Sequence, residues 1–302
     1  MKFVAAGGAR VSAIGLGAWQ FGTAEWGYGE DYARDEARKI VHRALDLGVN
    51  LIDTAEMYGF GRSERIVGEA IKGHRDQVFL ASKLFPVGLP LQVASRARGS
   101  ARRLGVDRID LYQQHWPSPM FPPGATMPRI RKLVENGLVT HVGVSNHSLT
   151  QWQAAEKSFG GPVLSNQVKF NLLERAPERD LVPWAKENGR IVIAYSPLAQ
   201  GLLSGKYVTS APRNLRRLRP AFSASSRGRL QPLIRALSEI ANMHNASAAQ
   251  VALAWLIRKP NVVAIPGASS VHQMEQNAAA ADIELSDEED ARLGGLTSAL
   301  KT

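Results

Sequence analysis

The chain contains no cysteine, which excludes several kinds of scaffold and site. A disulfide framework, a thiolate zinc site and a thiol nucleophile are all ruled out. No window holds the ~18 consecutive apolar residues of a membrane span, and residues 1–8 lack the apolar stretch of a signal peptide. We therefore expect a cytoplasmic protein that does not associate with membranes.

Acidic residues are missing from one long stretch of the chain. The 302 residues carry a formal charge of +10, and eight basic residues but no acidic one lie between Ser196 and Ser238. The eight are Lys206, Arg213, Arg216, Arg217, Arg219, Arg227, Arg229 and Arg235. Few aromatic residues are interleaved with them, as base stacking would require. The stretch favours a phosphate-bearing small ligand or a solvated loop over nucleic acid, which stays an alternative.

Two further motifs are absent. The glycines Gly15 and Gly17 lack a third glycine at the spacing of a Rossmann dinucleotide fingerprint, so that fold is not indicated. Six histidines show no metal-ligand spacing, and we assign no metal site to His42, His74, His141, His147, His244 and His272.

What the chain does have is a repeated alternation of short apolar runs and longer segments of helical period. The apolar runs cover residues 14–19, 51–55, 78–83, 109–115, 141–146, 163–170, 191–197 and 262–267. Helical segments between them include 63–72, 91–104, 127–138, 149–158 and 180–188. Such runs are typical of parallel strands that are buried on both faces. The pattern predicts an α/β protein, a (β/α)8 TIM barrel of one domain over residues 1–302.

The seventh unit departs from this repeat. After its strand we expect a long basic loop over residues 205–230, and loops of that length are usually functional or disordered. Two helical segments follow, 231–244 and 247–259, where one would complete the repeat. We therefore expect an extra helix outside the barrel.

Polar residues end three of the apolar runs. Asp53, Lys83 and His115 each close a run, and Tyr58 follows the first run after five positions. Each residue alone has a structural explanation, such as a helix cap, a snorkelling lysine, a satisfied core histidine or an interface aromatic. Because active sites of parallel barrels lie at the carboxyl ends of the strands, four such residues on successive units favour a shared site.

The chemistry of these four residues suits the reduction of a carbonyl group. A free phenol has a pKa of ~10, and a neighbouring ammonium can lower it by ~2–3 units. We expect Lys83 to lower the pKa of Tyr58 in this way, and Asp53 to keep Lys83 charged. His115 adds a donor that could orient a carbonyl oxygen. The set supplies an acid for a developing alkoxide, while hydride would come from a cofactor.

The same residues lie in motifs that resemble the aldo-keto reductase superfamily. The matching stretches are residues 14–19 (IGLGAW), 52–59 (IDTAEMYG) with Ser63 and Glu64, the run ending at Lys83, 110–115 (DLYQQH), 142–146 (VGVSN), 194–205 (AYSPLAQGLLSG) and 265–268 (IPGA) with Gln273 and Asn277. Their order and spacing run nearly end to end. The resemblance implies a catalytic tetrad of Asp53, Tyr58, Lys83 and His115, with Tyr58 as general acid.

The resemblance also implies a nicotinamide cofactor bound in extended form across the barrel mouth. Ser145, Asn146 and Gln167 resemble the groups that hold the carboxamide, and Tyr195 resembles the ring that stacks on the nicotinamide. The other implied cofactor residues are Gly17, Ala18, Trp19, Ser196, Leu198, Gln200, Gly201, Lys206, Gly267, Ser269, Gln273 and Asn277. Trp19, Trp26 and Trp116 are candidates for the substrate pocket, with plain packing as the alternative.

One position departs from the family pattern. Many members carry Arg or Lys after the 265–268 motif to grip the 2′-phosphate of NADPH, whereas this chain has Ser269 and Ser270. We still favour NADPH, with NADH possible, because an arginine of the basic loop could reach the phosphate. A nucleotide-sensing subunit with little turnover is the alternative function. The partner we expect is a small carbonyl substrate, and neither its identity nor the oligomeric state follows from the sequence.

Overall fold

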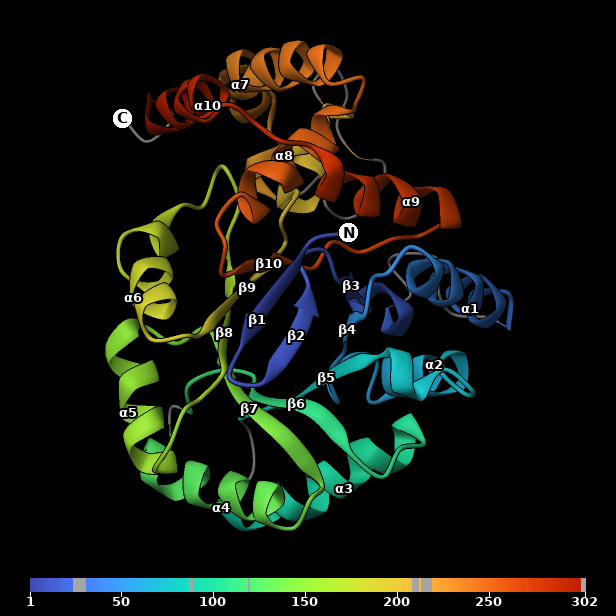
Figure 1. Cartoon of the computed structure of the whole chain (residues 1–302). Helices are drawn as coiled ribbons and strands as arrows, with labels where there is room; N and C mark the ends of the chain where they lie inside the picture. The colour runs from blue at the N-terminus through green and yellow to red at the C-terminus, as the bar shows by residue number, and fades with distance from the viewer. Residues whose placement is uncertain (24–30, 87–88, 119, 208–211, 213–218, 300–302) are drawn as a thin grey trace.

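The computed structural model describes residues 1–23, 31–86, 89–118, 120–207, 212 and 219–299, and these form a closed barrel of parallel strands (Figure 1). The eight-stranded sheet has the order β10-β9-β8-β7-β6-β5-β4-β3, so neighbours in sequence are neighbours in space. The strands are β3 (Leu16–Gly17), β4 (Leu51–Asp53), β5 (Phe79–Leu84), β6 (Ile109–Gln114), β7 (Val139–Ser145), β8 (Ser165–Lys169), β9 (Ile191–Tyr195) and β10 (Val262–Ala264).

The two edges of this sheet meet just before β3. Ile14 forms a parallel bridge with Ala264 of β10, and the backbone N–H of Gly15 donates to the Ala264 carbonyl at 2.8 Å. Each of the eight predicted runs overlaps one of these strands. The predicted (β/α)8 barrel is therefore confirmed.

Helices cover the outside of the barrel (Figure 1). They are α1 (Asp31–Asp46), α2 (Arg62–Ala70), α3 (Val93–Leu104), α4 (Pro123–Glu135), α5 (Leu149–Phe159), α6 (Leu181–Glu187), α8 (Ala248–Ile257) and α9 (Val271–Ala279). Local signals mark several ends: Ser148 and Ser247 form capping boxes before α5 and α8, and Gly105 and Gly160 end α3 and α5 in the left-handed conformation.

Two further helices, α7 (Ala224–Met243) and α10 (Asp287–Ala299), pack against each other outside this ring, as expected for extra helices. The helix α7 begins seven residues earlier than we predicted, because the Ser223 hydroxyl accepts the backbone N–H of Ser226 and caps it there. Arg227 and Arg229 are therefore helical rather than parts of the predicted loop. Arg213, Arg216 and Arg217 lie outside the described residues.

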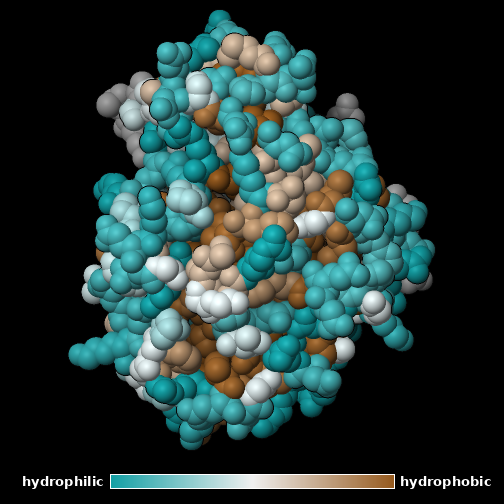
Figure 2. All heavy atoms as spheres, in the orientation of Figure 1, coloured by the Kyte–Doolittle hydropathy of each residue, from teal (hydrophilic) through white to brown (hydrophobic). Residues whose placement is uncertain are grey.

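A β-hairpin that the sequence analysis did not resolve closes the amino-terminal end of the barrel (Figure 1). Its strands β1 (Phe3–Ala6) and β2 (Ala9–Ser12) pair in antiparallel fashion around Gly7 and Gly8, whose φ values are 54° and 81°. Apolar hairpin residues pack against the barrel interior, the cluster comprising Val4, Ala9, Val11, Leu51, Ala81, Leu111, Leu164, Ile191, Ile193, Val263 and Ile265. Figure 2 views this closed end and shows apolar side chains near the hairpin, surrounded by hydrophilic ones.

The opposite end of the barrel interior is polar. Asp53, Lys83, Gln113 and Gln167 are all buried there, near the carboxyl ends of β4, β5, β6 and β8. Among the described residues, the hairpin covers the amino-terminal end and the buried polar side chains lie toward the carboxyl end, which is therefore the side on which we look for a site. Within the described residues, no helix is long and apolar enough to span a membrane.

Candidate active site

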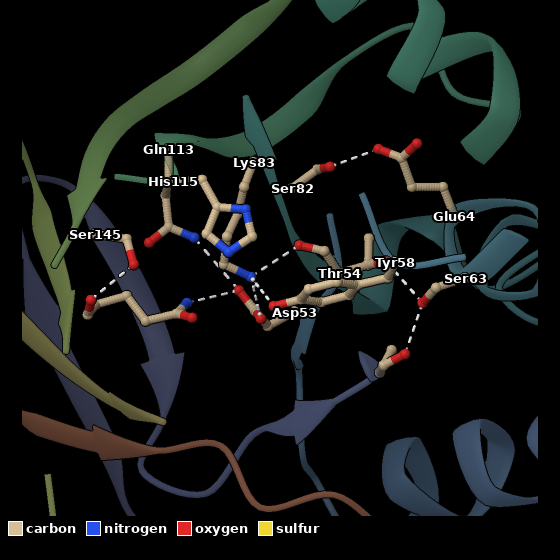
Figure 3. Close-up of polar contacts among 12 residues, drawn as sticks. Asp53, Thr54, Tyr58, Ser63, Glu64, Ser82, Lys83, Gln113, His115 and Ser145 are labelled. Atoms are coloured by element: carbon tan, nitrogen blue, oxygen red, sulfur yellow. Dashed lines mark hydrogen bonds and ion pairs between the residues drawn. The ribbon is translucent and has the colours of Figure 1, made fainter. Parts of the chain in front are cut away.

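Lys83 stands at the centre of the polar end of the barrel. Its Nζ donates to Asp53 Oδ2 at 2.5 Å, to the Thr54 carbonyl at 2.9 Å and to the Tyr58 hydroxyl at 3.2 Å (Figure 3). Burial disfavours the ammonium, yet the charges and hydrogen bonds of Asp53 and Tyr58 outweigh it and raise the pKa of Lys83. A fully buried lysine thus keeps its charge beside the phenol.

The second oxygen of the Asp53 carboxylate receives two glutamine amides. Gln167 Nε2 donates to Asp53 Oδ1 at 2.8 Å, and Gln113 Nε2 donates to the same oxygen at 3.3 Å. All three side chains are buried. Gln113 is not among the site residues predicted from the sequence. The signal was available, since Gln113 is two positions before His115 on a strand and therefore points to the same side of the sheet.

Tyr58 is held in place by the loop between β4 and α2. The Thr54 hydroxyl donates to Ser63 Oγ at 2.8 Å, and that hydroxyl donates to the Ala18 carbonyl at 2.7 Å, which ties the loop to the segment after β3. Gly59 lies directly against this segment, because a Cβ on it would come within 2.2 Å of the Gly22 carbonyl oxygen. This packing directs the phenol toward Lys83 (Figure 3).

Two side-chain contacts of the buried Glu64 hold β5 in place from outside the barrel. Ser82 Oγ donates to Glu64 Oε1 at 2.6 Å, and Arg103 Nε donates to Glu64 Oε2 at 2.6 Å. Glu64 is fully buried, so both of its oxygens need such partners. The pair joins α2 and α3 to the residue that precedes Lys83.

The structure corrects the expected acidity of Tyr58. Burial raises the pKa of the phenol, and the negative charge of Asp53 adds to this effect, while Lys83 acts in the opposite direction but does not prevail. The predicted contact between Lys83 and Tyr58 is present, but the predicted lowering of the Tyr58 pKa is wrong. The expectation counted the neighbouring cation and left out the desolvation of the phenol at this site.

His115 faces Tyr58 from the end of β6. The two rings meet edge to face with their centroids 5.8 Å apart. Burial and the charge of Lys83 lower the pKa of His115 to about 3, so the imidazole is neutral at physiological pH. Its buried Nδ1 has no hydrogen-bond partner, which favours the tautomer that carries the proton on Nε2. That tautomer makes His115 a donor.

Four of the expected cofactor residues form one group at the ends of β7, β8 and β9. Ser145 Oγ donates to the Gln167 carbonyl at 2.8 Å, Asn146 Nδ2 donates to Ser145 Oγ at 3.0 Å, and the Tyr195 hydroxyl donates to Asn146 Oδ1 at 2.9 Å. Asn146 has a φ of 59°, and its Nδ2 also donates to the His115 carbonyl at 3.1 Å. Such left-handed residues outside glycine often mark ligand sites.

A second group follows β9, where the chain adopts several left-handed residues in succession. Ser196, Ala199 and Gln200 have φ values of 50°, 47° and 59°. Leu198 precedes the helical turn η6 (Ala199–Ser204), which contains Gln200 and Gly201, and Lys206 is exposed just after it. Arg219 Nη1 donates to Gln200 Oε1 at 2.6 Å, which brings one arginine of the basic stretch to this turn.

A third group lies where β3 meets the segment after β10. Gly17 N–H donates to the Pro266 carbonyl at 3.0 Å, and Ala18 N–H donates to the Asp53 carbonyl at 2.8 Å. Further along, Ser269 N–H and Oγ both donate to Gln273 Oε1, at 2.8 and 2.9 Å, and Asn277 Nδ2 donates to the Gly267 carbonyl at 3.2 Å. These residues hold the loop that begins α9.

Large apolar side chains gather on one half of the barrel rim. Among the described residues, eight such side chains are exposed, and seven follow β3, β4, β5 or β6: Trp19, Met57, Phe60, Leu89, Leu91, Trp116 and Met120. The eighth is Met243 at the end of α7. Trp116 stacks beside His115 with a centroid separation of 6.5 Å. Trp26, the third predicted pocket tryptophan, lies outside the described residues.

A family model described as the aldo/keto reductase family matches residues 13–297. An uncharacterised oxidoreductase of Mycobacterium tuberculosis is 54% identical over 289 residues, which cover 95% of this chain and 90% of that protein. The methylglyoxal reductase YeaE of Escherichia coli is 38% identical, covering 95% of this chain and 91% of its own length.

Solved structures show the same likeness. An aldo-keto reductase of Klebsiella pneumoniae in complex with NADPH is 35% identical with a TM-score of 0.81, covering 98% of this chain and 95% of that one. A glycerol dehydrogenase of Gluconobacter oxydans is 30% identical with a TM-score of 0.89 and the same two coverages. The family model spans nearly the whole barrel, including every described strand of the closed sheet, and the chain belongs to the aldo/keto reductase family.

Proposed function

We propose that this protein reduces aldehydes or ketones to alcohols by hydride transfer from NADPH, with Tyr58 as the proton donor. The observation that carries the proposal is the contact of 3.2 Å between Lys83 Nζ and the Tyr58 hydroxyl at the open end of the barrel. An acid, a buried cation and a neutral imidazole donor meet there.

The proton transfer suits the reductive direction. Because its pKa is raised, the phenol of Tyr58 is protonated at neutral pH and ready to donate. As an alkoxide develops on the substrate, the Tyr58 O–H bond breaks and the proton passes to the substrate oxygen. The charged Lys83 then lies against the phenolate that remains and stabilises it. The Nε2–H of His115 orients the carbonyl oxygen before transfer.

The residues at the ends of β7, β8 and β9 fit a nicotinamide cofactor. Ser145, Asn146 and Gln167 present hydroxyl and amide groups of the kind that hold a carboxamide. The ring of Tyr195 is half-buried beside them, and its hydroxyl donates a hydrogen bond to Asn146. The bound cofactor would supply the hydride. A relative of known structure binds NADPH, which supports this choice.

The preference for NADPH over NADH is supported by two cations beside the turn η6. Lys206 is exposed directly after this turn, and Arg219 is bonded to Gln200 within it. Either side chain could contact a phosphate where Ser269 and Ser270 lack a charge. Comparable catalytic efficiency with NADH and NADPH would remove the reason for assigning these cations to the cofactor.

The apolar half of the rim indicates substrates that carry an apolar or aromatic group next to the carbonyl. Trp116 lies beside His115, and the other exposed apolar side chains extend outward along four adjacent loops. Burying apolar surface there would stabilise a bound substrate by ~25 cal/mol per Å².

A steady-state assay tests the proposal. The purified protein is incubated with NADPH and a panel of activated aldehydes, and cofactor oxidation is followed by absorbance, while cofactor binding is followed separately by fluorescence. We expect turnover with at least the aromatic aldehydes. Binding of NADPH without turnover on any member of the panel would instead favour the nucleotide-sensing alternative.

A further inference from the structure

The Asp53 carboxylate has different partners on its two oxygens. Oδ2 contacts Lys83 and Oδ1 receives the amide of Gln113 from β6 (Figure 3). The same oxygen also receives the amide of Gln167 from β8. A carboxylate with one cationic partner can rotate about its χ2 torsion, whereas these two amides fix the plane of the group. The orientation that results directs Oδ2 at the ammonium.

Burial of the Gln113 side chain in the barrel interior is unfavourable by itself. It is fully buried, and its amide oxygen has no hydrogen-bond partner. An apolar side chain of the same length would fill this place without burying an unpaired oxygen. The amide N–H bond to Asp53 is therefore the interaction that accounts for a glutamine here. Groups that violate a local rule in this way are expected at functional sites.

The neighbouring strand leaves room for this glutamine. Gln113 is in register with Lys83 of β5 and with Gly143 of β7. A Cβ at position 143 would lie 2.9 Å from Gln113 Cγ and 2.4 Å from Ser165 Oγ. The missing side chain of Gly143 thus lets Gln113 lie along the barrel wall and reach Asp53.

We propose that Gln113 is a positioning residue, which fixes the Asp53 carboxylate so that Lys83 stays in contact with Tyr58. The inference rests on the proposed function for its effect on turnover, although its geometric content does not depend on that function. Without the Gln113 amide, Oδ1 keeps only Gln167 as a donor. The Asp53 carboxylate can then turn about its hydrogen bond to Gln167, and the Lys83 ammonium follows Oδ2 away from Tyr58.

The variant Gln113→Met removes the donor and keeps the length of the side chain. We expect kcat for an aldehyde to fall about tenfold, the size of effect for one lost positioning bond, with KM and the dissociation constant for NADPH within twofold of wild type. The melting temperature should stay equal or rise, because an unpaired buried oxygen has been removed. A glutamine with a purely structural role predicts the opposite pattern, a lower melting temperature and an unchanged kcat.

Gln114 offers a matched control on the same strand. It is also buried and also has an amide oxygen without a partner, but strand alternation directs it away from Asp53. The variant Gln114→Met should therefore leave kcat unchanged. Equal losses of kcat in the two variants would mean that β6 itself is disturbed, and the positioning role would be rejected.

A second variant tests the positioning role of Gln113 through the pH dependence of activity. In Gln113→Glu the introduced carboxyl can donate to Asp53 while it is protonated, but it repels Asp53 once it is ionised. Activity relative to Gln113→Met should therefore be restored at low pH and lost as pH rises. A pH profile with the same shape as that of Gln113→Met would contradict the proposal.

A crystal structure of Gln113→Met separates this inference from the proposed function. We expect the Asp53 carboxylate to turn and the distance from Lys83 Nζ to the Tyr58 hydroxyl to exceed 3.2 Å. Unchanged positions of both groups would overturn the inference, whether or not the wild type reduces carbonyls. Absence of turnover in the wild type would overturn only the proposed function.

Discussion

Lys83 Nζ lies 3.2 Å from the Tyr58 hydroxyl, and the two groups perturb each other in opposite ways. The phenol and Asp53 keep the lysine charged inside the barrel by raising its pKa. The lysine, in turn, acts against the burial that raises the pKa of Tyr58. An acid that stays protonated at neutral pH next to a fixed cation is suited to donate a proton and to leave a stabilised phenolate.

Replacing Lys83 with Met should move the pH dependence of the reaction upward. Without the ammonium, burial and the negative charge of Asp53 act on the phenol unopposed, so the Tyr58 pKa rises further and its deprotonated form requires a higher pH. Oxidation of an alcohol needs that deprotonated form, so the rising limb of its pH profile should shift to higher pH. Initial rates of alcohol oxidation with NADP⁺ between pH 6 and pH 11 measure this limb, and an identical profile in the variant would exclude the role of Lys83.

His115 should make the folded protein lose stability in acid. Its pKa is about 3 in the folded state, below the unfolded value of ~6.5, so the unfolded state binds the proton more tightly. The corresponding stability is present above pH ~6.5 and is lost as pH falls toward 3. Urea unfolding at pH 7 and pH 5 should show a smaller loss in His115→Phe than in wild type. His272→Phe, at an exposed position of α9, should keep the wild-type loss.

Trp116 should contribute to binding of apolar substrates. Truncation in Trp116→Ala removes the ring beside His115, so KM for an aromatic aldehyde should rise roughly tenfold, as expected for ~1–2 kcal/mol of lost apolar contact, while KM for a small polar aldehyde changes little. Met243→Ala removes an exposed apolar side chain at the end of α7, outside these loops, and serves as the control. Equal effects on the two aldehydes would argue against an apolar subsite at this rim.

Arg219 should affect the binding of the phosphate-rich cofactor. We expect Arg219→Ala to weaken NADPH binding by roughly three- to tenfold, as for one partly exposed ionic contact, and to affect NADH less. Arg229→Ala, from the same basic stretch but on α7, is the matched control. Fluorescence titration measures both dissociation constants, and equal values for the two variants and wild type would remove Arg219 from the cofactor site.

The sequence predicted the strands and the contacts of the site better than its electrostatics. Short apolar runs between helical segments located all eight barrel strands, because strands that are buried on both faces consist largely of apolar residues. The hairpin at Gly7 and Gly8 was missed, although the paired glycines are a turn signal, because its strands are only four residues long. The extent of one domain over residues 1–302 stays a prediction.

Contacts between strands on different sides of the barrel could not be predicted from the sequence. The bonds from Gln113 and Gln167 to Asp53 depend on register between strands that are far apart in sequence, and no local pattern specifies that register. The direction of the Tyr58 pKa shift depends on how deeply the packed loops bury the phenol, which the neighbouring charges in the sequence do not reveal. Sequence patterns located the groups, and packing decided their ionisation.

The most direct test of the account compares wild type with Tyr58→Phe in the reduction of an aromatic aldehyde by NADPH. Removal of the only proposed proton donor should lower kcat by roughly 10²–10⁴-fold, the range typical of general acid catalysis, while the dissociation constant for NADPH stays within about twofold. Wild-type turnover that survives unchanged in Tyr58→Phe would show that the proton comes from another group.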